Sequence, residues 1–469
     1  MKYILLLLSF LCLIGNLNAQ TNSTKPNIIL ILSDDAGYAD FGFQGSKVMK
    51  TPALDKLASQ SIVCPQAYVA GAVCGPSRAA LLTGKYQQRF GFEENNVPGY
   101  MQNYQLADDE MGLPLDQKTI GNYMQEIGYK TGIIGKWHMG NTDQFHPFKR
   151  GFDFFYGFRG GARSYWPFDD NHPNHRKEDR MERGFKHFEE PEGYLTDVFA
   201  EETIQFINAH QKEPFFLFLS FNAVHTPMHA KEEDLNEFPE LEGKRKQLAA
   251  MTFTMDKACQ SIFDHLKKSG LDKNTIIIYT NDNGGPTDAN ASDNSPLSGT
   301  KANHYEGGIR VPFVFHMPNH KKFPREYLPS VSTLDLLPTC YALGGGEVEN
   351  LEGIDGVNLL PYFKGDKSEV PHQTLYWKKE NRGAIRDGNW KFLRFPDRPA
   401  ELYDLSSDLS EVNNLADKYP EKIKEYYKML FDWELTLARP RWQLQRKYEG
   451  AAMERIDKYK RQNQNNKEN

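Results

Sequence analysis

The chain has 469 residues, of which 39% are hydrophobic and 25% charged, a composition typical of a globular protein with one large domain and space for a smaller one. Its 56 basic and 62 acidic side chains give a net charge of −6. That balance argues against nucleic acid as a partner, because binding to a phosphate backbone favours a basic surface.

The first residues have the pattern of a secretory signal peptide. Lys2 supplies a positive charge, residues 4–14 form an almost uninterrupted apolar run, and Ala19 offers a small residue near a cleavage point. The run is short for a membrane span, although an uncleaved anchor and lipidation at Cys12 are alternatives. We therefore expect residues 1–19 to be removed, the mature protein to be periplasmic or secreted, and no membrane span to remain.

Short apolar strands alternate with helix-like segments over most of the chain. The continuous apolar character of the strands suits a sheet covered on both faces, and the alternation predicts a doubly wound, mainly parallel α/β sheet. The predicted strands are Asn27–Leu32, Thr131–Gly135, Phe215–Phe221 and Thr275–Thr280, and the predicted helices are Thr51–Ser59, Lys118–Ile127, Thr196–His210 and Lys244–Ser269.

After the glycine run at 344–346 the pattern changes to shorter alternating segments. They predict a small antiparallel sheet with a hairpin turn at 387–389 and one helix packed on it. The almost wholly polar residues 449–469 are expected to fray or to be disordered. The segments are strands at 374–378, 383–386 and 390–394 and a helix at Pro420–Leu437, and the expected division is a signal peptide at 1–19, a main domain at 20–367, a C-terminal α+β subdomain at 368–445 and a polar tail at 446–469.

Polar side chains follow each of the four strong strands. In open α/β sheets the ligand binds beyond the carboxyl ends of the strands, so we expect these side chains to meet at one edge of the sheet. They are Asp34 and Asp35 after the first strand, Lys136 and His138 after the second, His225 after the third, and Asp282 and Asn283 after the fourth.

Four of these side chains offer oxygen ligands. The carboxylates of Asp34, Asp35 and Asp282 would repel one another strongly if they lay side by side, and a divalent cation would remove that repulsion. With Asn283 they form an all-oxygen set, which favours calcium or magnesium over zinc. Helix capping or a solvated turn is the alternative explanation for the Asp-Asp pair.

The segment 74–84 carries the most specific motif. Cys74 opens the pattern Cys-x-Pro-Ser-Arg, and Thr-Gly begins six residues after the serine. This pattern resembles the signature of the formylglycine-dependent (type I) sulfatases of the alkaline phosphatase superfamily, in which a formylglycine-generating maturation enzyme oxidises the cysteine to Cα-formylglycine. Further segments that resemble that family lie at 26–38, 128–138, 281–284 and 402–414, so the resemblance runs from about residue 25 to about residue 433.

The resemblance implies an alkaline phosphatase-like fold and a sulfuric ester hydrolase, with residues 20–367 as its catalytic domain. The substrate would be a sulfate monoester of a polysaccharide or oligosaccharide, such as ulvan, carrageenan or a glycosaminoglycan. One hydroxyl of the hydrated aldehyde would attack sulfur, and the other would expel sulfate. One Ca²⁺ would be held by Asp34, Asp35, Asp282, Asn283 and modified Cys74. The implied catalytic residues are Cys74 as nucleophile, Arg78 to orient it, Lys136 and Lys301 to bind sulfate oxygens, His138 as base, and His225 with Lys301 to protonate the leaving oxygen.

A substrate-binding surface is suggested by the aromatic and basic character of residues 145–187. Cationic side chains could bind anionic sugars and aromatic rings could stack on them, although a packed surface insertion would show the same composition. The candidates are Arg159, Arg163, Tyr165, Trp166, His172, His175 and Arg176, with Arg89 and residues 93–96 as further ones. A second metal at His172 and His175 is a weak alternative, because no carboxylate pattern accompanies them.

The sequence leaves two rival functions open. The first is hydrolysis of phosphate or phosphonate esters, against which Ser77 and Thr83-Gly84 stand in the extended signature. The second is sugar binding on a decayed enzyme scaffold, which would have lost some of the site residues. The four cysteines beyond the leader could also form two disulfides in an oxidising compartment; they are Cys64, Cys74, Cys259 and Cys340.

Overall fold

The computed structural model describes residues 25–97, 99–102, 107–168, 179–318 and 323–462. The expected signal peptide lies outside these ranges, as do His172, His175 and Arg176. Within the described ranges, no helix combines the length and the apolar character needed to cross a membrane.

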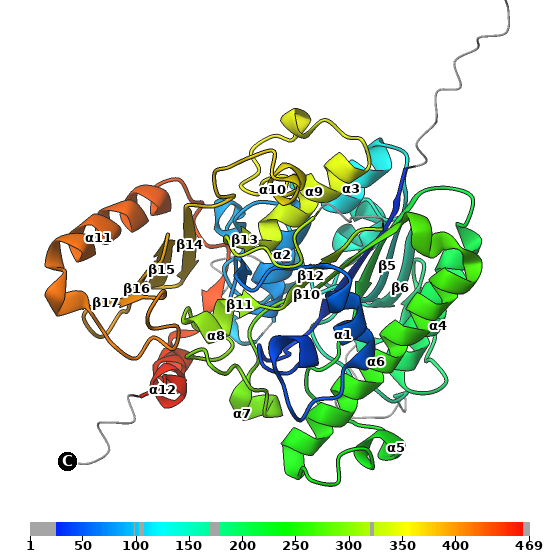
Figure 1. Cartoon of the computed structure of the whole chain (residues 1–469), viewed down its shortest axis with the longest axis horizontal. Coiled ribbons are helices and arrows are strands. Elements are labelled where there is room, and N and C mark those ends of the chain that lie inside the picture. The colour runs from blue at the N-terminus through cyan, green and yellow to red at the C-terminus, as the bar shows by residue number, and fades with distance from the viewer. Residues whose placement is uncertain (1–24, 98, 103–106, 169–178, 319–322, 463–469) are drawn as a thin grey trace, which may run out of the picture.

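A nine-stranded sheet forms the centre of the molecule (Figure 1), in the order β2-β12-β10-β1-β9-β5-β6-β7-β8. Its middle strands, from β10 to β6, run parallel, and both edges are antiparallel. The prediction of a mainly parallel sheet is therefore confirmed. The strands are β1 (Asn27–Ser33), β2 (Ile62–Val63), β5 (Lys130–Lys136), β6 (Phe154–Phe158), β7 (Glu182–Arg183), β8 (His187–Phe188), β9 (Phe215–Ser220), β10 (Thr275–Asn281) and β12 (Phe313–His316).

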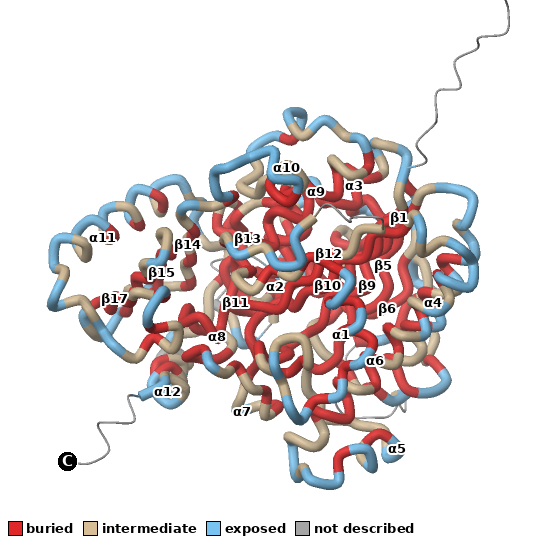
Figure 2. Tube along the Cα trace, viewed as in Figure 1, coloured by how far each residue is buried: buried red, intermediate tan, exposed pale blue. Residues whose placement is uncertain are grey.

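Helices cover both faces of this sheet. On β1, Ile28 and Leu30 pack into a cluster with α2, α3 and α9, whereas Ile29 and Ile31 pack into a second cluster with α1, α4 and α6. Because successive strand residues point to opposite faces, a strand between two helical layers must be apolar at every position. Figure 2 shows the resulting buried centre. The helices are α1 (Pro52–Ser59), α2 (Cys74–Thr83), α3 (Ile120–Glu126), α4 (Leu195–Ala209), α6 (Gly243–Ser269) and α9 (Leu336–Leu343).

A smaller antiparallel sheet lies beside the main body (orange in Figure 1), in the order β14-β15-β16-β17, with α11 packed on it. Its edge strand β14 alternates between buried and more exposed positions, whereas β15, β16 and β17 are buried at most positions. The predicted sheet and helix are therefore confirmed. The elements are β14 (Thr374–Lys379), β15 (Arg382–Asp387), β16 (Trp390–Arg394), β17 (Glu401–Asp404) and α11 (Pro420–Glu434).

The remaining elements are short. Two of them pair segments far apart in the chain, because β18 near the C-terminus runs antiparallel to β4. The elements are β3 (Ala67–Tyr68), β4 (Met101–Gln102), β11 (Arg310–Val311), β13 (Val331–Ser332), β18 (Gln443–Leu444), α5 (Glu232–Leu235), α7 (Thr287–Asn290), α8 (Glu306–Ile309), α10 (Leu360–Lys364) and α12 (Glu449–Tyr459).

One expectation is wrong. The polar tail does not fray over its first part, because α12 docks on the main body: Met453 and Ile456 are buried, and the Tyr459 carbonyl oxygen accepts a 3.0 Å hydrogen bond from the amide of Gly299. Two apolar residues three positions apart suffice to anchor one face of a short helix.

The structure contains no disulfide among the described cysteines: Cys64, Cys74, Cys259 and Cys340 are all free and buried.

Candidate active site

The carboxyl ends of the parallel strands bring the predicted polar residues together. Asp34 and Asp35 directly follow β1, Lys136 is the last residue of β5, and Asp282 and Asn283 directly follow β10. Strands β10, β1, β9 and β5 are neighbours in the sheet, so their ends meet at one edge. His138 and His225 come from the loops after β5 and β9, and Cys74 and Arg78 come from α2.

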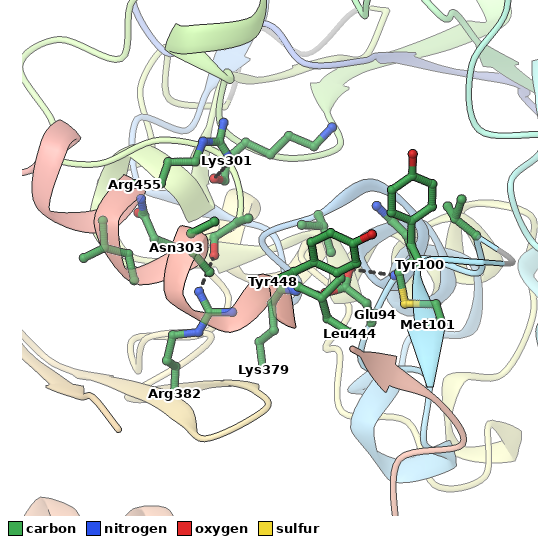
Figure 3. A pocket seen from close by; sticks show the side chains of 17 residues that line it. Glu94, Tyr100, Met101, Lys301, Asn303, Lys379, Arg382, Leu444, Tyr448 and Arg455 are labelled. Atoms are coloured by element: carbon green, nitrogen blue, oxygen red, sulfur yellow. Dashed lines mark hydrogen bonds and ion pairs between the residues drawn. The ribbon is translucent and has the colours of Figure 1, made fainter. Parts of the chain in front are cut away.

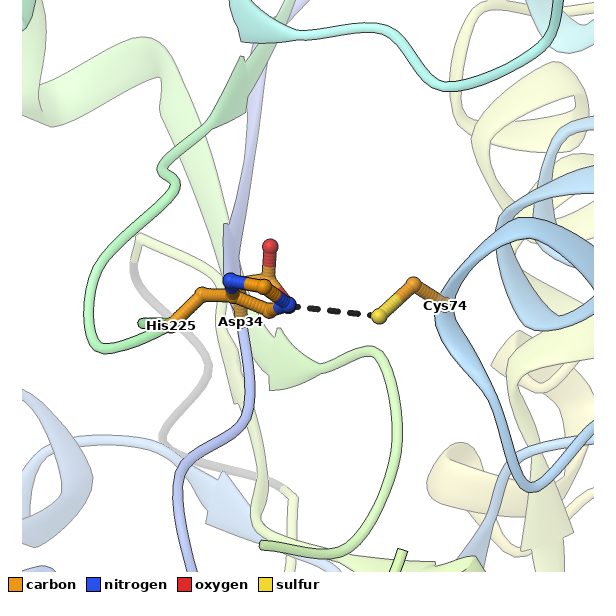
Figure 4. Close-up of side chains that lie close together, drawn as sticks. All are labelled: Asp34, Cys74 and His225. Carbon is orange, nitrogen blue, oxygen red and sulfur yellow. Dashed lines mark hydrogen bonds between the residues drawn. The ribbon is translucent and has the colours of Figure 1, made fainter. Parts of the chain in front are cut away.

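Cys74 is the first residue of α2, and its sulfur points toward Asp34 (Figure 4). The Sγ atom lies 3.5 Å from Asp34 Oδ1 and 3.9 Å from Asp35 Oδ1. The amide of Gly75, in the first turn of the helix, donates a 2.8 Å hydrogen bond to Asn95 Oδ1. A group bound at Cys74 therefore sits at a helix N-terminus, where the peptide dipoles favour an anion.

Buried cations hold two of the carboxylates. Lys136 Nζ donates a 2.5 Å hydrogen bond to Asp34 Oδ2, and Arg78 Nε donates a 2.9 Å bond to Asp282 Oδ2. All four side chains are almost fully buried. Arg78 also donates to the hydroxyl of Ser220, the last residue of β9, at 2.6 Å. Ser220 therefore holds the guanidinium of Arg78 in place. Ser220 is not among the residues predicted from the sequence, although its position at the end of a strand could have indicated it.

Lys301 lies against the opposite side of the cluster. Its ammonium donates to both oxygens of Asp35, at 2.6 and 2.8 Å, and it is 3.0 Å from Cys74 Sγ. Burial opposes the charged form, but the negative charge of Asp35 and its neighbours raises the pKa of Lys301 above its usual range. Lys301 thus places a fixed positive charge next to the sulfur.

The two histidines face the same space. His225 Nδ1 donates a 2.6 Å hydrogen bond to the carbonyl oxygen of Thr226, which leaves Nε2 directed at the cluster, 3.5 Å from Asp35 Oδ2. Neither ring nitrogen of His138 has a hydrogen-bond partner among the residues that the structure describes, although both are buried. Burial lowers the pKa of both imidazoles, to about 4 for His225 and well below the ordinary value for His138.

The side-chain oxygens of Asp34, Asp35, Asp282 and Asn283 form an oxygen cluster, which has the composition of a site for a hard cation. Ligand atoms of Asp34, Asp35, Cys74 and Asp282 all lie within 4.8 Å of one another, and all four residues are buried. The side-chain oxygen of Asn283 is buried and has no hydrogen-bond partner within the described part of the chain, while its amide nitrogen donates to Asp35. Carboxylate and amide oxygens are the ligands that calcium and magnesium prefer. The residues present therefore fit such an ion.

A cavity of about 140 Å³ opens onto these groups and is lined by Cys74, His138 and His225. Asn95, Asn96 and Val97 form part of its wall, with Asn141 and residues 160–162. Sequence inspection singled out the 93–96 loop but missed Asn141 and the Gly160-Gly161-Ala162 segment, which carry no distinctive pattern.

Most of the substrate-binding candidates have structural roles. Arg159 binds Glu182, Arg163 binds Glu190, and Arg89 binds Asp355, each at 2.7 Å or less. Tyr165 is fully buried and donates hydrogen bonds to the carbonyl oxygens of Asn222 and His225, so that it supports the histidine loop. Trp166 is exposed, and Glu93 and Glu94 pair with Lys378 and Lys379.

Known proteins are similar to this chain in sequence and in fold. Arylsulfatase J of Mus musculus is 33% identical over 413 residues, 81% of this chain and 67% of its own length. N-acetylgalactosamine-6-sulfatase of Homo sapiens is 31% identical over 386 residues, 76% of this chain and 72% of its own. The crystal structure of Ps i-CgsB in complex with k-i-k-neocarrahexaose superposes with a TM-score of 0.82 at 36% identity, covering 92% of this chain and 98% of that one.

The match also holds at the level of the whole family. The profile of the family described as Sulfatase matches residues 26–346, which span the strand ends, the α2 cysteine and the Lys301 loop. The polar groups gathered at the carboxyl edge of the sheet therefore belong to an enzyme that hydrolyses sulfuric esters, and the chain is a member of the sulfatase family.

Proposed function

We propose that this enzyme is an exported sulfatase that removes sulfate esters from a sulfated polysaccharide or oligosaccharide. It would use one Ca²⁺ and a formylglycine that a maturation enzyme makes from Cys74. The position of Cys74 carries the proposal, because its side chain lies at a helix N-terminus between the oxygen cluster and the ammonium of Lys301. The Cys-x-Pro-Ser-Arg pattern around it supports the maturation step.

Calcium would be held by Asp34, Asp35, Asp282 and Asn283, with residue 74 as a further ligand. Its bound charge would stabilise negative charge on the sulfate oxygens and lower the pKa of a hydroxyl at residue 74. The formyl group, once hydrated, would supply an oxygen nucleophile with a second hydroxyl for release of sulfate.

The side chains of the chain itself would bind the ester and move its protons. Lys136 and Lys301 lie on two sides of the cluster and would bind sulfate oxygens where charge develops during the reaction. His225 directs Nε2 into the cavity, where the negative charge of a bound sulfate ester would favour the protonated ring, which would then give a proton to the leaving oxygen. His138, with no protein partner for its ring, is free to take a proton from residue 74. Arg78 would hold Asp282 in place.

The relatives indicate which substrates to test first. The solved relative at 36% identity contains k-i-k-neocarrahexaose, and the human relative is an N-acetylgalactosamine-6-sulfatase. We propose a sulfated algal polysaccharide of the carrageenan type as the first substrate, and a glycosaminoglycan carrying N-acetylgalactosamine sulfate as the second. The expected leader at 1–19 supports action in the periplasm or outside the cell.

The test combines the maturation state with turnover. The protein is co-expressed with a formylglycine-generating enzyme, and the peptide containing residue 74 is weighed by mass spectrometry. The mass loss of thiol-to-aldehyde conversion is expected, together with hydrolysis of an aryl sulfate that greatly exceeds hydrolysis of the matching aryl phosphate. Cys74→Ala should abolish turnover. Faster hydrolysis of the phosphate, or no turnover despite a confirmed aldehyde, would contradict the proposal.

A further inference from the structure

A second cavity, of about 380 Å³, adjoins the active-site cavity. Asn95 and Val97 line both cavities. Lys301 lines the second one, and its ammonium is also 3.0 Å from Cys74 Sγ. The two cavities therefore lie next to each other, with Lys301 both beside the sulfur and in the lining of the second cavity.

Segments far apart in the sequence form its walls (Figure 3). They are Val73 before α2, Glu94, Asn95 and Val97 together with Tyr100 and Met101, the loop around Lys301, the β14–β15 hairpin, and the C-terminal segment that leads into α12. Ala451 and Ala452 present small side chains on α12, so that the helix forms a wall without filling the space. The helix that the sequence predicted to be a frayed tail is thus part of the cavity.

The walls carry more positive than negative charge. Among the described residues that line it, Glu94 is the one acidic side chain, against four cationic ones: Lys301, Lys379, Arg382 and Arg455. Acids outside the lining pair with three of these cations: Asp35 with Lys301, Glu380 with Arg382 and Asp288 with Arg455. Glu94 is already in contact with Lys379. Burial, followed by the neighbouring charge of Arg382, lowers the pKa of Lys379 to about 8, despite the opposing carboxylate of Glu380. An anionic group in the cavity would stabilise these cations.

Aromatic rings supply the other side of the cavity. The rings of Tyr100 and Tyr448 lie 5.7 Å apart between centroids, opposite Arg382 and Arg455 in Figure 3. Tyr100 is 55% exposed, so its ring is open to a ligand. An aromatic wall facing a few polar groups is typical of a small-molecule site, and a Tyr ring gives a flat apolar surface with a polar tip.

We propose that this cavity binds the sugar unit next to the one that is desulfated, and that this neighbouring unit carries its own anionic group, a sulfate ester or a carboxylate. The inference rests on the proposed function, because it requires the first sulfate ester to be bound at residue 74. The enzyme would accordingly prefer oligosaccharides with anionic groups on adjacent units over singly sulfated ones.

The experiment uses the matured full-length enzyme and four substrates. An aryl sulfate occupies only the cavity at residue 74, and three oligosaccharides have a neighbouring unit that is neutral, sulfated or carboxylated. The variants are Tyr448→Ala and Arg382→Gln, with Phe431→Ala and Arg325→Gln as matched controls on residues outside the cavity. Each kcat/KM for an oligosaccharide is divided by that for the aryl sulfate, so that any general loss of activity cancels.

The wild type is expected to favour the doubly anionic oligosaccharides. Tyr448→Ala should lower the ratio by about tenfold for all oligosaccharides, chiefly through KM, because it removes a stacking surface. Arg382→Gln should lower it only for the two charged ones, and the more affected of these identifies the anion. The controls should leave every ratio unchanged.

Two other results would overturn the inference, and they are distinguishable. If the wild type hydrolyses aryl sulfate but the ratios of both variants equal those of the controls, the cavity binds no sugar and the proposed function stands. If the wild type hydrolyses neither kind of substrate with the aldehyde confirmed, the proposed function fails and this inference fails with it.

Discussion

Arg455 on α12 donates a 2.9 Å hydrogen bond to the carbonyl oxygen of Lys301. Its guanidinium also donates hydrogen bonds to both carboxylate oxygens of Asp288. The C-terminal helix is thereby tied to the loop that places Lys301 beside Cys74. Nothing in the local sequence of either segment indicates this connection, since 154 positions separate the two residues.

Loss of the hydrogen bond from Arg455 to Lys301 should reduce catalysis, because Lys301 would be held less firmly beside Cys74. We expect Arg455→Ala to lower kcat for an aryl sulfate by about tenfold, because Lys301 would lose a support that orders its loop. KM and kcat are measured together with Tm on the matured enzyme. Lys458→Ala, an exposed substitution on the same helix, should change none of them. Equal kcat in Arg455→Ala and Lys458→Ala would show that Arg455 does not position Lys301.

The sequence predicted the main elements because their patterns are long and regular. The predicted helix Lys244–Ser269 corresponds to α6 at Gly243–Ser269, and the predicted strand Phe215–Phe221 to β9 at Phe215–Ser220. The convergence of polar residues at one edge followed from the rule for parallel sheets. Such inferences need only local pattern and topology.

Contacts between distant segments could not be predicted. Arg159 looked like a candidate for binding sugars, but Glu182 and Asp143 neutralise it, and only the fold brings those acids to it. Likewise, α12 is stabilised by two buried side chains within a polar segment, too few to give a periodic signal. The second cavity was missed for the same reason, because five separate segments form it.

Metal binding should stabilise the folded enzyme. Addition of Ca²⁺ to chelator-treated protein is expected to raise Tm and restore activity, because a ligand that binds only the native state stabilises it by mass action. Asn283→Ala removes the unpaired oxygen and should weaken the Ca²⁺-dependent rise in Tm. Asp234→Asn alters a buried carboxylate in contact with Thr254, away from the site, and should retain the full rise. No change in Tm up to millimolar Ca²⁺ would contradict the assignment of the cluster.

The space around His138 depends on Gly161. A Cβ atom at position 161 would lie 2.6 Å from His138 Nε2, closer than such contacts occur, so the ring would have to move. We expect Gly161→Ala to lower kcat by at least about tenfold with little change in Tm, because a small displacement of a catalytic group is costly. Gly450→Ala, where the added Cβ meets nothing within 4 Å, is the matched control. Unchanged kcat in Gly161→Ala would argue against a role of His138 in proton transfer.

A buried ionic cluster joins the C-terminal sheet to the main body. Lys391 on β16 donates a 2.7 Å hydrogen bond to Glu306, and Glu411 accepts one of 2.8 Å from the Glu306 amide. Burial, together with the charge of Glu306 and against the attraction of Lys391, raises the pKa of Glu411 to about 8. In the folded protein Glu411 therefore keeps its proton up to about pH 8. In the unfolded chain Glu411 releases that proton around its ordinary pKa of 4.5.

The contribution of Glu411 to stability should consequently fall as pH rises from about 5 to about 8, since Glu411 binds fewer protons in the unfolded state over that range. Glu411→Gln replaces the protonated acid by a neutral amide of the same shape and removes this dependence. We expect the Tm of Glu411→Gln, relative to the wild type, to be higher at pH 8 than at pH 5.5. Glu421→Gln changes an exposed carboxylate and should show no such difference between the two pH values. Parallel Tm profiles for Glu411→Gln and the wild type would mean that Glu411 is ionised in the folded protein.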